Sequence, residues 1–153
     1  MNNFTFGNAR YQYYETISGG SGAGEGFDGT DVVQTNMTNS RLTDPEILEF
    51  RFPVRLESYA IRAGSGGAGR WQGGNGGVRK LRFLEPMTAA ILSNNRVYAP
   101  FGMAGGEPAA RGVNSVLRAD GSGEGVGHIG PVEMAADDTF VIETPGGGGY
   151  GSV

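Results

Sequence analysis

The chain has 153 residues with one histidine, no cysteine and a formal net charge of −4 at pH 7. This composition excludes disulfides, zinc–thiolate sites and any site that needs two imidazoles. The mild acidic excess argues against nucleic acid or an anionic membrane as a partner. No apolar stretch is long enough to span a membrane and no secretory leader is visible, so we expect one cytoplasmic domain.

Glycine dominates the pattern of the sequence. All 29 glycines except Gly7 fall into clusters, at 19–29, 64–77, 102–112, 121–130 and 146–151. Because these clusters alternate with β-branched and aromatic runs, they predict elaborate loops on a folded β scaffold rather than a linker.

An aromatic run, Tyr11 to Glu15, precedes the first glycine cluster. Core packing is the default expectation for the tyrosines. Glu15 is a candidate general base if it is desolvated, and an ordinary loop carboxylate otherwise.

The first predicted regular element is a short helix after residue 43. Thr43 and Glu46 have the spacing of a capping box, and Pro45 suits the first helical turn. Pro53 prevents a long continuation, so we expect about two turns.

Strand patterns follow the helix. In 51–62 the apolar positions change parity, which predicts a β-bulge near Glu57 and Ser58. Further strands are predicted at 78–85, 88–92, 96–99, 113–119 and 139–144. Two hairpins are expected, with turns at 93–95 and at Asp120–Gly121. The predicted fold is all-β, mainly an antiparallel sheet or barrel-like sandwich, with long glycine-rich loops and one short helix.

Two glycine-rich stretches leave alternatives open. Gly64, Gly66 and Gly69 match a dinucleotide-binding pattern, but no long helix can begin at 70–74, so a wide strand–loop–strand connection is favoured. The run at 146–153 is either a flexible end or a place where backbone amides line a site.

The densest polar stretch is 36–44. Its amides, hydroxyls, guanidinium and carboxylate suit an amide or carboxylate ligand. The alternative is that they cap the helix and bind loop backbone. The candidate substrate-site residues are Asn39, Arg41 and Asp44, with Glu15 nearby; no catalytic residue, metal ligand or cofactor ligand is assigned.

The order of these motifs resembles one family. Tyr14-Glu15-Thr16, the run 37–46, the glycine loop 62–76, the run 100–106 and the terminal run 144–151 are similar to the C-terminal portion of the hydantoinase B/5-oxoprolinase (N-methylhydantoinase) family. Whole members are several times longer, so residues 1–153 are expected to be one C-terminal domain of a B-type subunit, and Met1 an internal methionine at the start of a fragment.

The resemblance implies ATP-dependent opening of a cyclic amide such as 5-oxoproline or a hydantoin. It implies a hydantoinase A-type partner that binds ATP, and a divalent metal held by the missing N-terminal part. Many members carry a histidine where this chain has Asn36. By this resemblance the isolated fragment is inactive.

Three other functions stay open. The chain is alternatively a non-catalytic β module for subunit assembly, part of a related ATP-dependent ketone carboxylase, or a carbohydrate-binding domain that uses Trp71 and the tyrosines.

Overall fold

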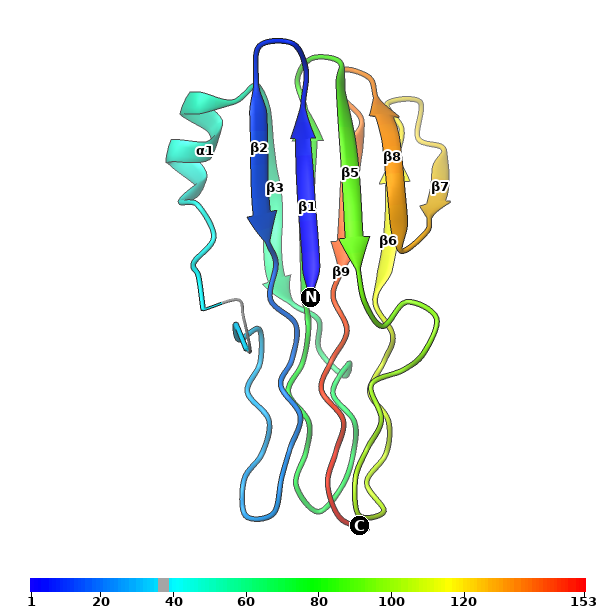
Figure 1. Ribbon diagram of the computed structural model, residues 1–153. Coiled ribbons are helices and arrows are strands. Elements are labelled where there is room, and N and C mark those ends of the chain that lie inside the picture. Colours follow the sequence, from blue (N-terminus) through cyan, green and yellow to red (C-terminus); the bar gives the residue numbers. More distant parts are fainter. Residues whose placement is uncertain (36–38) are drawn as a thin grey trace.

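The computed structural model describes residues 1–35 and 39–153 and contains two antiparallel sheets packed face to face (Figure 1). The first sheet has the strand order β2-β1-β5-β8 and the second β3-β4-β9-β6-β7. The strands are β1 (Asn2–Gly7), β2 (Gln12–Thr16), β3 (Val54–Ile61), β4 (Gly77–Phe83), β5 (Met87–Ser93), β6 (Val113–Leu117), β7 (Gly123–Val126), β8 (Ile129–Met134) and β9 (Thr139–Glu143). This sandwich confirms the predicted all-β class.

The core lies between the sheets and is aromatic. Phe4 of β1 and Phe140 of β9 meet across the interface with ring centroids 4.8 Å apart, and both are almost fully buried. Phe83 of β4 meets Phe6 edge-on at 5.4 Å. Alternation along each strand sends every second side chain into this layer.

The predicted β-bulge is confirmed, because the register of β3 against β4 shifts between Leu56 and Ser58. The predicted hairpin after 113–119 is also confirmed as β6 and β7. The strand predicted at 96–99 is wrong. Arg96 turns back to bond Asn2 and Asn114, Asn95 adopts a φ of 58°, and the chain then runs away from the sheet.

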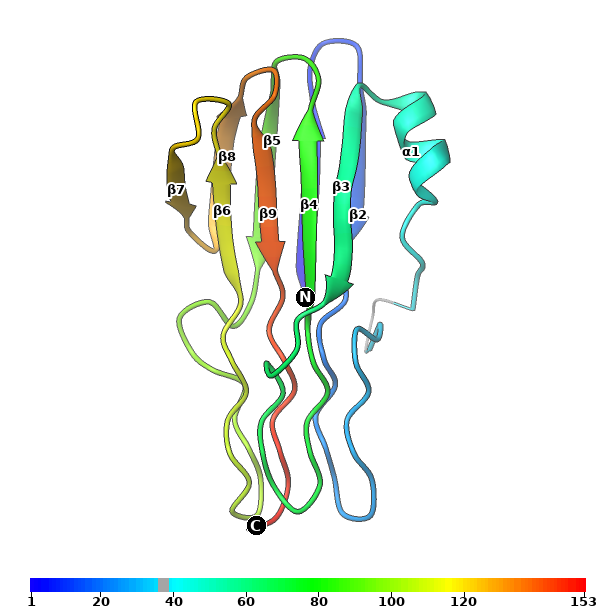
Figure 2. The ribbon, with the colours of Figure 1, turned by 180° about the vertical axis from the view of Figure 1, so that it is seen from behind.

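The helix α1 (Pro45–Arg51) packs beside β3 and buries Leu48 (Figure 2). Its N-cap is Asp44, whose carboxylate accepts from the Glu46 amide at 2.9 Å. The predicted cap, Thr43, is wrong by one residue, since its hydroxyl is bonded to Tyr13 instead.

Below the sandwich, extended glycine-rich segments run side by side to the far end of the molecule (Figures 1 and 2). We call this half the glycine bundle; its segments are 19–24, 27–33, 62–70, 71–77, 98–103, 105–112 and 144–151. Its backbones are so close that a Cβ on Gly147 would overlap the Ser21 carbonyl, and one on Gly73 the Gly147 carbonyl. Glycine is therefore required there for close approach of chains.

Candidate functional site

Glu15, a predicted site residue, lies on β2 and points into the sandwich. Arg79 of β4 donates from Nε to Oε1 of Glu15 at 2.7 Å and from Nη2 to Oε2 at 2.9 Å. Both side chains are almost fully buried, at 2% and 3% exposure. This bidentate ion pair neutralises both charges and links the first sheet to the second.

A tyrosine connects this ion pair to the polar stretch that follows. The Tyr13 hydroxyl lies 3.1 Å from Oε2 of Glu15 and 2.8 Å from Oγ1 of Thr43. Burial raises the pKa of Tyr13 to about 12, so the phenol is protonated at neutral pH. The Tyr13 hydroxyl thus links Glu15 to Thr43, the residue that precedes Asp44.

The other predicted site residues divide into two groups. Asp44 is exposed and its carboxylate caps α1, as the alternative interpretation expected. Asn39 and Arg41 are exposed, and neither has a hydrogen bond or ion pair to another described residue. Asn36, discussed above as a departure from the family pattern, lies outside the described residues.

A pocket of about 200 Å³ opens at the waist, where the sandwich meets the glycine bundle. Three carboxamides, Asn2, Gln34 and Asn94, lie in its wall with Thr16 and Ser18. Gln34 donates from Nε2 to the Thr16 carbonyl at 2.7 Å, which leaves its Oε1 buried without a partner. A buried acceptor of this kind favours a ligand that can donate a hydrogen bond.

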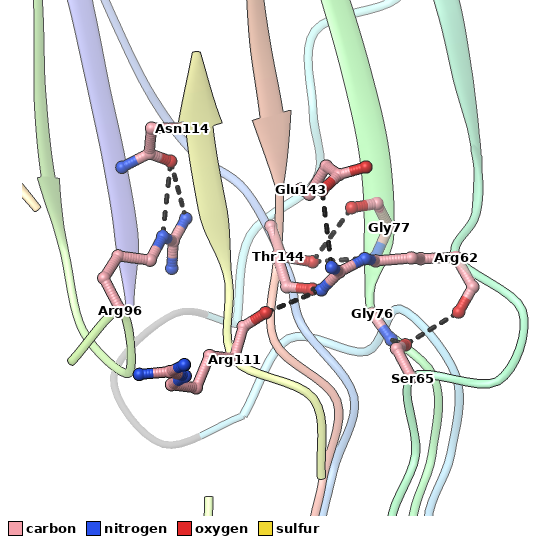
Figure 3. A network of polar contacts seen from close by, with 9 residues as sticks. All are labelled: Arg62, Ser65, Gly76, Gly77, Arg96, Arg111, Asn114, Glu143 and Thr144. Atoms are coloured by element: carbon pink, nitrogen blue, oxygen red, sulfur yellow. Dashed lines mark hydrogen bonds and ion pairs between the residues drawn. The ribbon is translucent and has the colours of Figure 1, made fainter. Parts of the chain in front are cut away.

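One residue of the pocket wall, Asn2, is held in place by Arg96, which was not predicted as a site residue. Arg96 donates to Oδ1 of Asn2 at 2.6 Å. It also donates to Oδ1 of Asn114 at 2.9 Å (Figure 3). Burial, together with the nearby charge of Arg62, lowers the pKa of Arg96 to about 10. Because Asn2 also donates to the Ile17 carbonyl at 2.9 Å, its amide is held firmly at the pocket.

Arg62, which directly follows β3, joins segment 105–112 of the glycine bundle to β9. It donates to the Arg111 carbonyl at 2.8 Å and pairs with Glu143 at 3.3 Å (Figure 3). Only its place at the start of the glycine loop 62–76 could have marked it in the sequence.

The glycine loop 62–76 joins two strands. The Gly64–Gly69 pattern lies in a connection from β3 to β4 with no helix after it, which confirms the strand–loop–strand prediction. Within 1–35 and 39–153, no group of three or more His, Asp or Glu side chains is placed to hold a metal ion. The described residues therefore do not fit the divalent metal expected of a complete enzyme.

No helix in the described part of the chain is both long and apolar enough to cross a bilayer.

Comparison with known proteins identifies relatives that match the whole length of this chain. The sequence model of the family described as Hydantoinase B/oxoprolinase matches residues 1–153. A 5-oxoprolinase of Dictyostelium discoideum is 47% identical over 151 residues, which cover 99% of this chain and 12% of the relative. The chain therefore spans a small part of the curated relatives that it matches.

Two solved structures share the fold. A nucleotide-free acetone carboxylase superposes with a TM-score of 0.82 at 18% identity, over 99% of this chain and 25% of that one. An ATP-dependent caprolactamase of Pseudomonas jessenii superposes with a TM-score of 0.78 at 23% identity, over 98% of this chain and 28% of that one.

Proposed function

Because the chain belongs to the hydantoinase B/oxoprolinase family, we propose that it is the C-terminal domain of an ATP-dependent hydrolase of cyclic amides, with 5-oxoproline as the first substrate to test. The observation that carries this proposal is the 47% identity to a 5-oxoprolinase across 99% of the chain. The caprolactamase, whose substrate is also a lactam, shares the fold.

The waist pocket supplies the chemistry that such a role needs. A lactam ring offers one N–H donor and one carbonyl acceptor, and Oε1 of Gln34 is the buried acceptor that lacks a donor. The neutral amides around it suit an uncharged ring. Binding and orienting the ring is therefore the step that we assign to these residues.

Arg41 and Asn39 are proposed to face the substrate, because their side chains are exposed and unpaired on the stretch between the pocket and α1. Asp44 supports that stretch by capping α1, and Glu15 supports it through Tyr13 and Thr43. A carboxylate of the substrate would pair with the Arg41 guanidinium.

ATP activation and any metal chemistry are assigned to other parts of the enzyme. When present, ATP would supply the phosphoryl group that activates the lactam oxygen, so that the ring carbonyl carbon becomes open to attack by water. A hydantoinase A-type subunit or domain is the proposed source of the nucleotide site. The domain described here would then hold the ring and exclude bulk water. We propose a cytoplasmic location.

The test is a chimeric enzyme. The matching region of the Dictyostelium 5-oxoprolinase is replaced by this chain, and ATP-dependent opening of 5-oxoproline is measured. We expect the chimera to be active, Arg41→Ala to lower kcat/KM by about tenfold or more, and Gln34→Leu to raise KM.

Arg51→Ala is the matched control, because Arg51 is an exposed arginine at the end of α1. If kcat and KM are unchanged by Arg41→Ala and Gln34→Leu in an active chimera, the domain is an assembly module and the proposed site is wrong.

A further inference from the structure

The segment 145–151 lies at the centre of the glycine bundle. Pro145 to Gly149 are all buried. Backbone hydrogen bonds join this central segment to five others, namely 19–24, 62–70, 71–77, 98–103 and 105–112. A β-strand has neighbours on two sides only, so the central segment is not part of a sheet.

The donors of the central segment repeat every third residue. Gly146 and Gly149 donate to segment 105–112, whereas Gly147 and Tyr150 donate to segment 71–77. This period is that of an extended helix with about three residues per turn. Successive residues therefore point in three directions around the segment. The first two are those toward 105–112 and toward 71–77, and the third is the direction of residues 145, 148 and 151.

In that third direction, one backbone N–H group lacks a hydrogen-bond acceptor among the described residues. Pro145 has no N–H, and Gly151 donates to the Met103 carbonyl at 2.9 Å. The N–H of Gly148 has no hydrogen-bond partner among the described residues, although Gly148 is buried. Leaving a buried amide unpaired is unfavourable, and such groups are rare in folded proteins.

The five neighbours form an incomplete ring around the central segment. Each is hydrogen-bonded to the next in the order 19–24, 71–77, 62–70, 105–112, 98–103. Between 98–103 and 19–24, the described residues make no backbone bond. Within 1–35 and 39–153, the ring is open at that point only.

A groove of about 620 Å³ lies at this opening. Its walls come from Gly19 to Ala23 on one side and Tyr98 to Met103 on the other, and Pro145 to Gly149 lie between them. Among the residues that the structure describes, no charged side chain lines this groove. Tyr98 and Phe101 stand at the rim, 82% and 75% exposed.

We propose that this groove binds one more extended peptide segment, uncharged and with glycine at every third residue. Its backbone carbonyl would accept from the Gly148 N–H, and its glycines would face the central segment as those of the other segments do. A second copy of this chain is a poor source, because its glycine segments are already used in its own bundle. The source to which we commit is polypeptide of a longer family protein outside these 153 residues, since the Dictyostelium relative is matched over only 12% of its length.

The test follows amide hydrogen exchange of the full chain by NMR. The probe is a capped peptide of four Gly-Pro-Asn repeats, both free and joined to Met1 by a flexible linker, because Met1 lies in the groove wall. Proline sets the extended conformation in advance, and the linker gives a local concentration of about millimolar. We expect Gly148 exchange to slow about tenfold or more, while Gly147 and Gly149, already bonded, stay unchanged.

Matched variants make the test specific. Gly22→Leu fills the groove, because a Cβ on Gly22 meets only the Gly148 carbonyl at 3.8 Å, and it should abolish the slowing. Gly125→Leu, on β7 with open space around it, should leave the slowing intact. Unchanged protection of Gly147 confirms that each variant is folded.

Two results would overturn the proposal: no slowing at Gly148 with the joined peptide, or equal slowing with a peptide that has valine in place of every glycine. Neither result depends on lactam turnover, so this proposal and the proposed enzymatic function fail separately.

Discussion

The two halves of this molecule are stabilised by different parts of the chain. In the sandwich, side chains meet across the sheets, as Phe4 and Phe140 do at 4.8 Å and Glu15 and Arg79 do at 2.7 Å. In the glycine bundle, backbone meets backbone, as Gly67 donates to the Gly147 carbonyl at 2.9 Å. The stability of the sandwich therefore depends on which side chains are present, whereas the stability of the glycine bundle depends on glycine, which has no side chain.

The largest expected effect is in the sandwich. Arg79→Met leaves the Glu15 carboxylate buried without its cation, and should lower the free energy of unfolding by about 3–5 kcal/mol. Urea unfolding measures it. The double variant Glu15→Gln with Arg79→Met should lose less, because no charge is then stranded; an equal loss would show that the pair acts through packing alone.

The bundle should be sensitive to a single methyl group. Gly147→Ala places a Cβ against the Ser21 carbonyl, and should destabilise by about 1–3 kcal/mol. Gly125→Ala, which has open space, is the control and should change stability by less than about 0.5 kcal/mol. Similar thermal midpoints for the two variants would contradict the backbone-contact account.

The helix beside the sandwich should respond more weakly. Asp44→Ala removes the carboxylate that caps α1, at a cost of about 1 kcal/mol by urea unfolding. Asp44→Asn keeps a capping oxygen and should recover most of that loss. Failure of asparagine to do so would mean that the charge of Asp44, rather than its cap, matters.

The smallest effect is a pH dependence at the edge of the sandwich. Burial raises the pKa of Tyr13 in the folded protein to about 12, above the ordinary value of 10.0. The protonated phenol therefore contributes fully to the free energy of unfolding below pH 10, and this contribution is lost as the pH rises toward 12. Tyr13→Phe should flatten the decline of stability across that window. Phenolate absorbance gives the titration directly, and a midpoint near 10.0 would refute the shift.

Local patterns predicted most of the second sheet but only β5 of the first, since no strand was predicted at β1, β2 or β8. The change of parity in 51–62 located the bulge of β3, and proline with acidic residues located α1. β8 was missed because Pro131 interrupts its pattern, which an edge strand tolerates. The strand predicted at 96–99 failed because Arg96 bonds Asn2, which is 94 positions away in the sequence.

The candidate site was only partly visible in the sequence. Glu15 stood out as the carboxylate in an aromatic run, but its partner Arg79 lies 64 residues away, on the core face of β4 between Gly77 and Leu81. The buried acceptor of Gln34 gives no sequence signal, because it depends on which neighbour its amide nitrogen has bonded.

The sequence alone determined the fold class, the family pattern and the places where backbones must come close, because alternation, capping and glycine act within a few residues. Only the tertiary structure decided how the glycine clusters are used. Whether a glycine amide is paired depends on segments brought together from distant parts of the chain. That is why Gly147 and Gly148, neighbours of identical type, differ: one is bonded to Gly74, and the other faces an open groove.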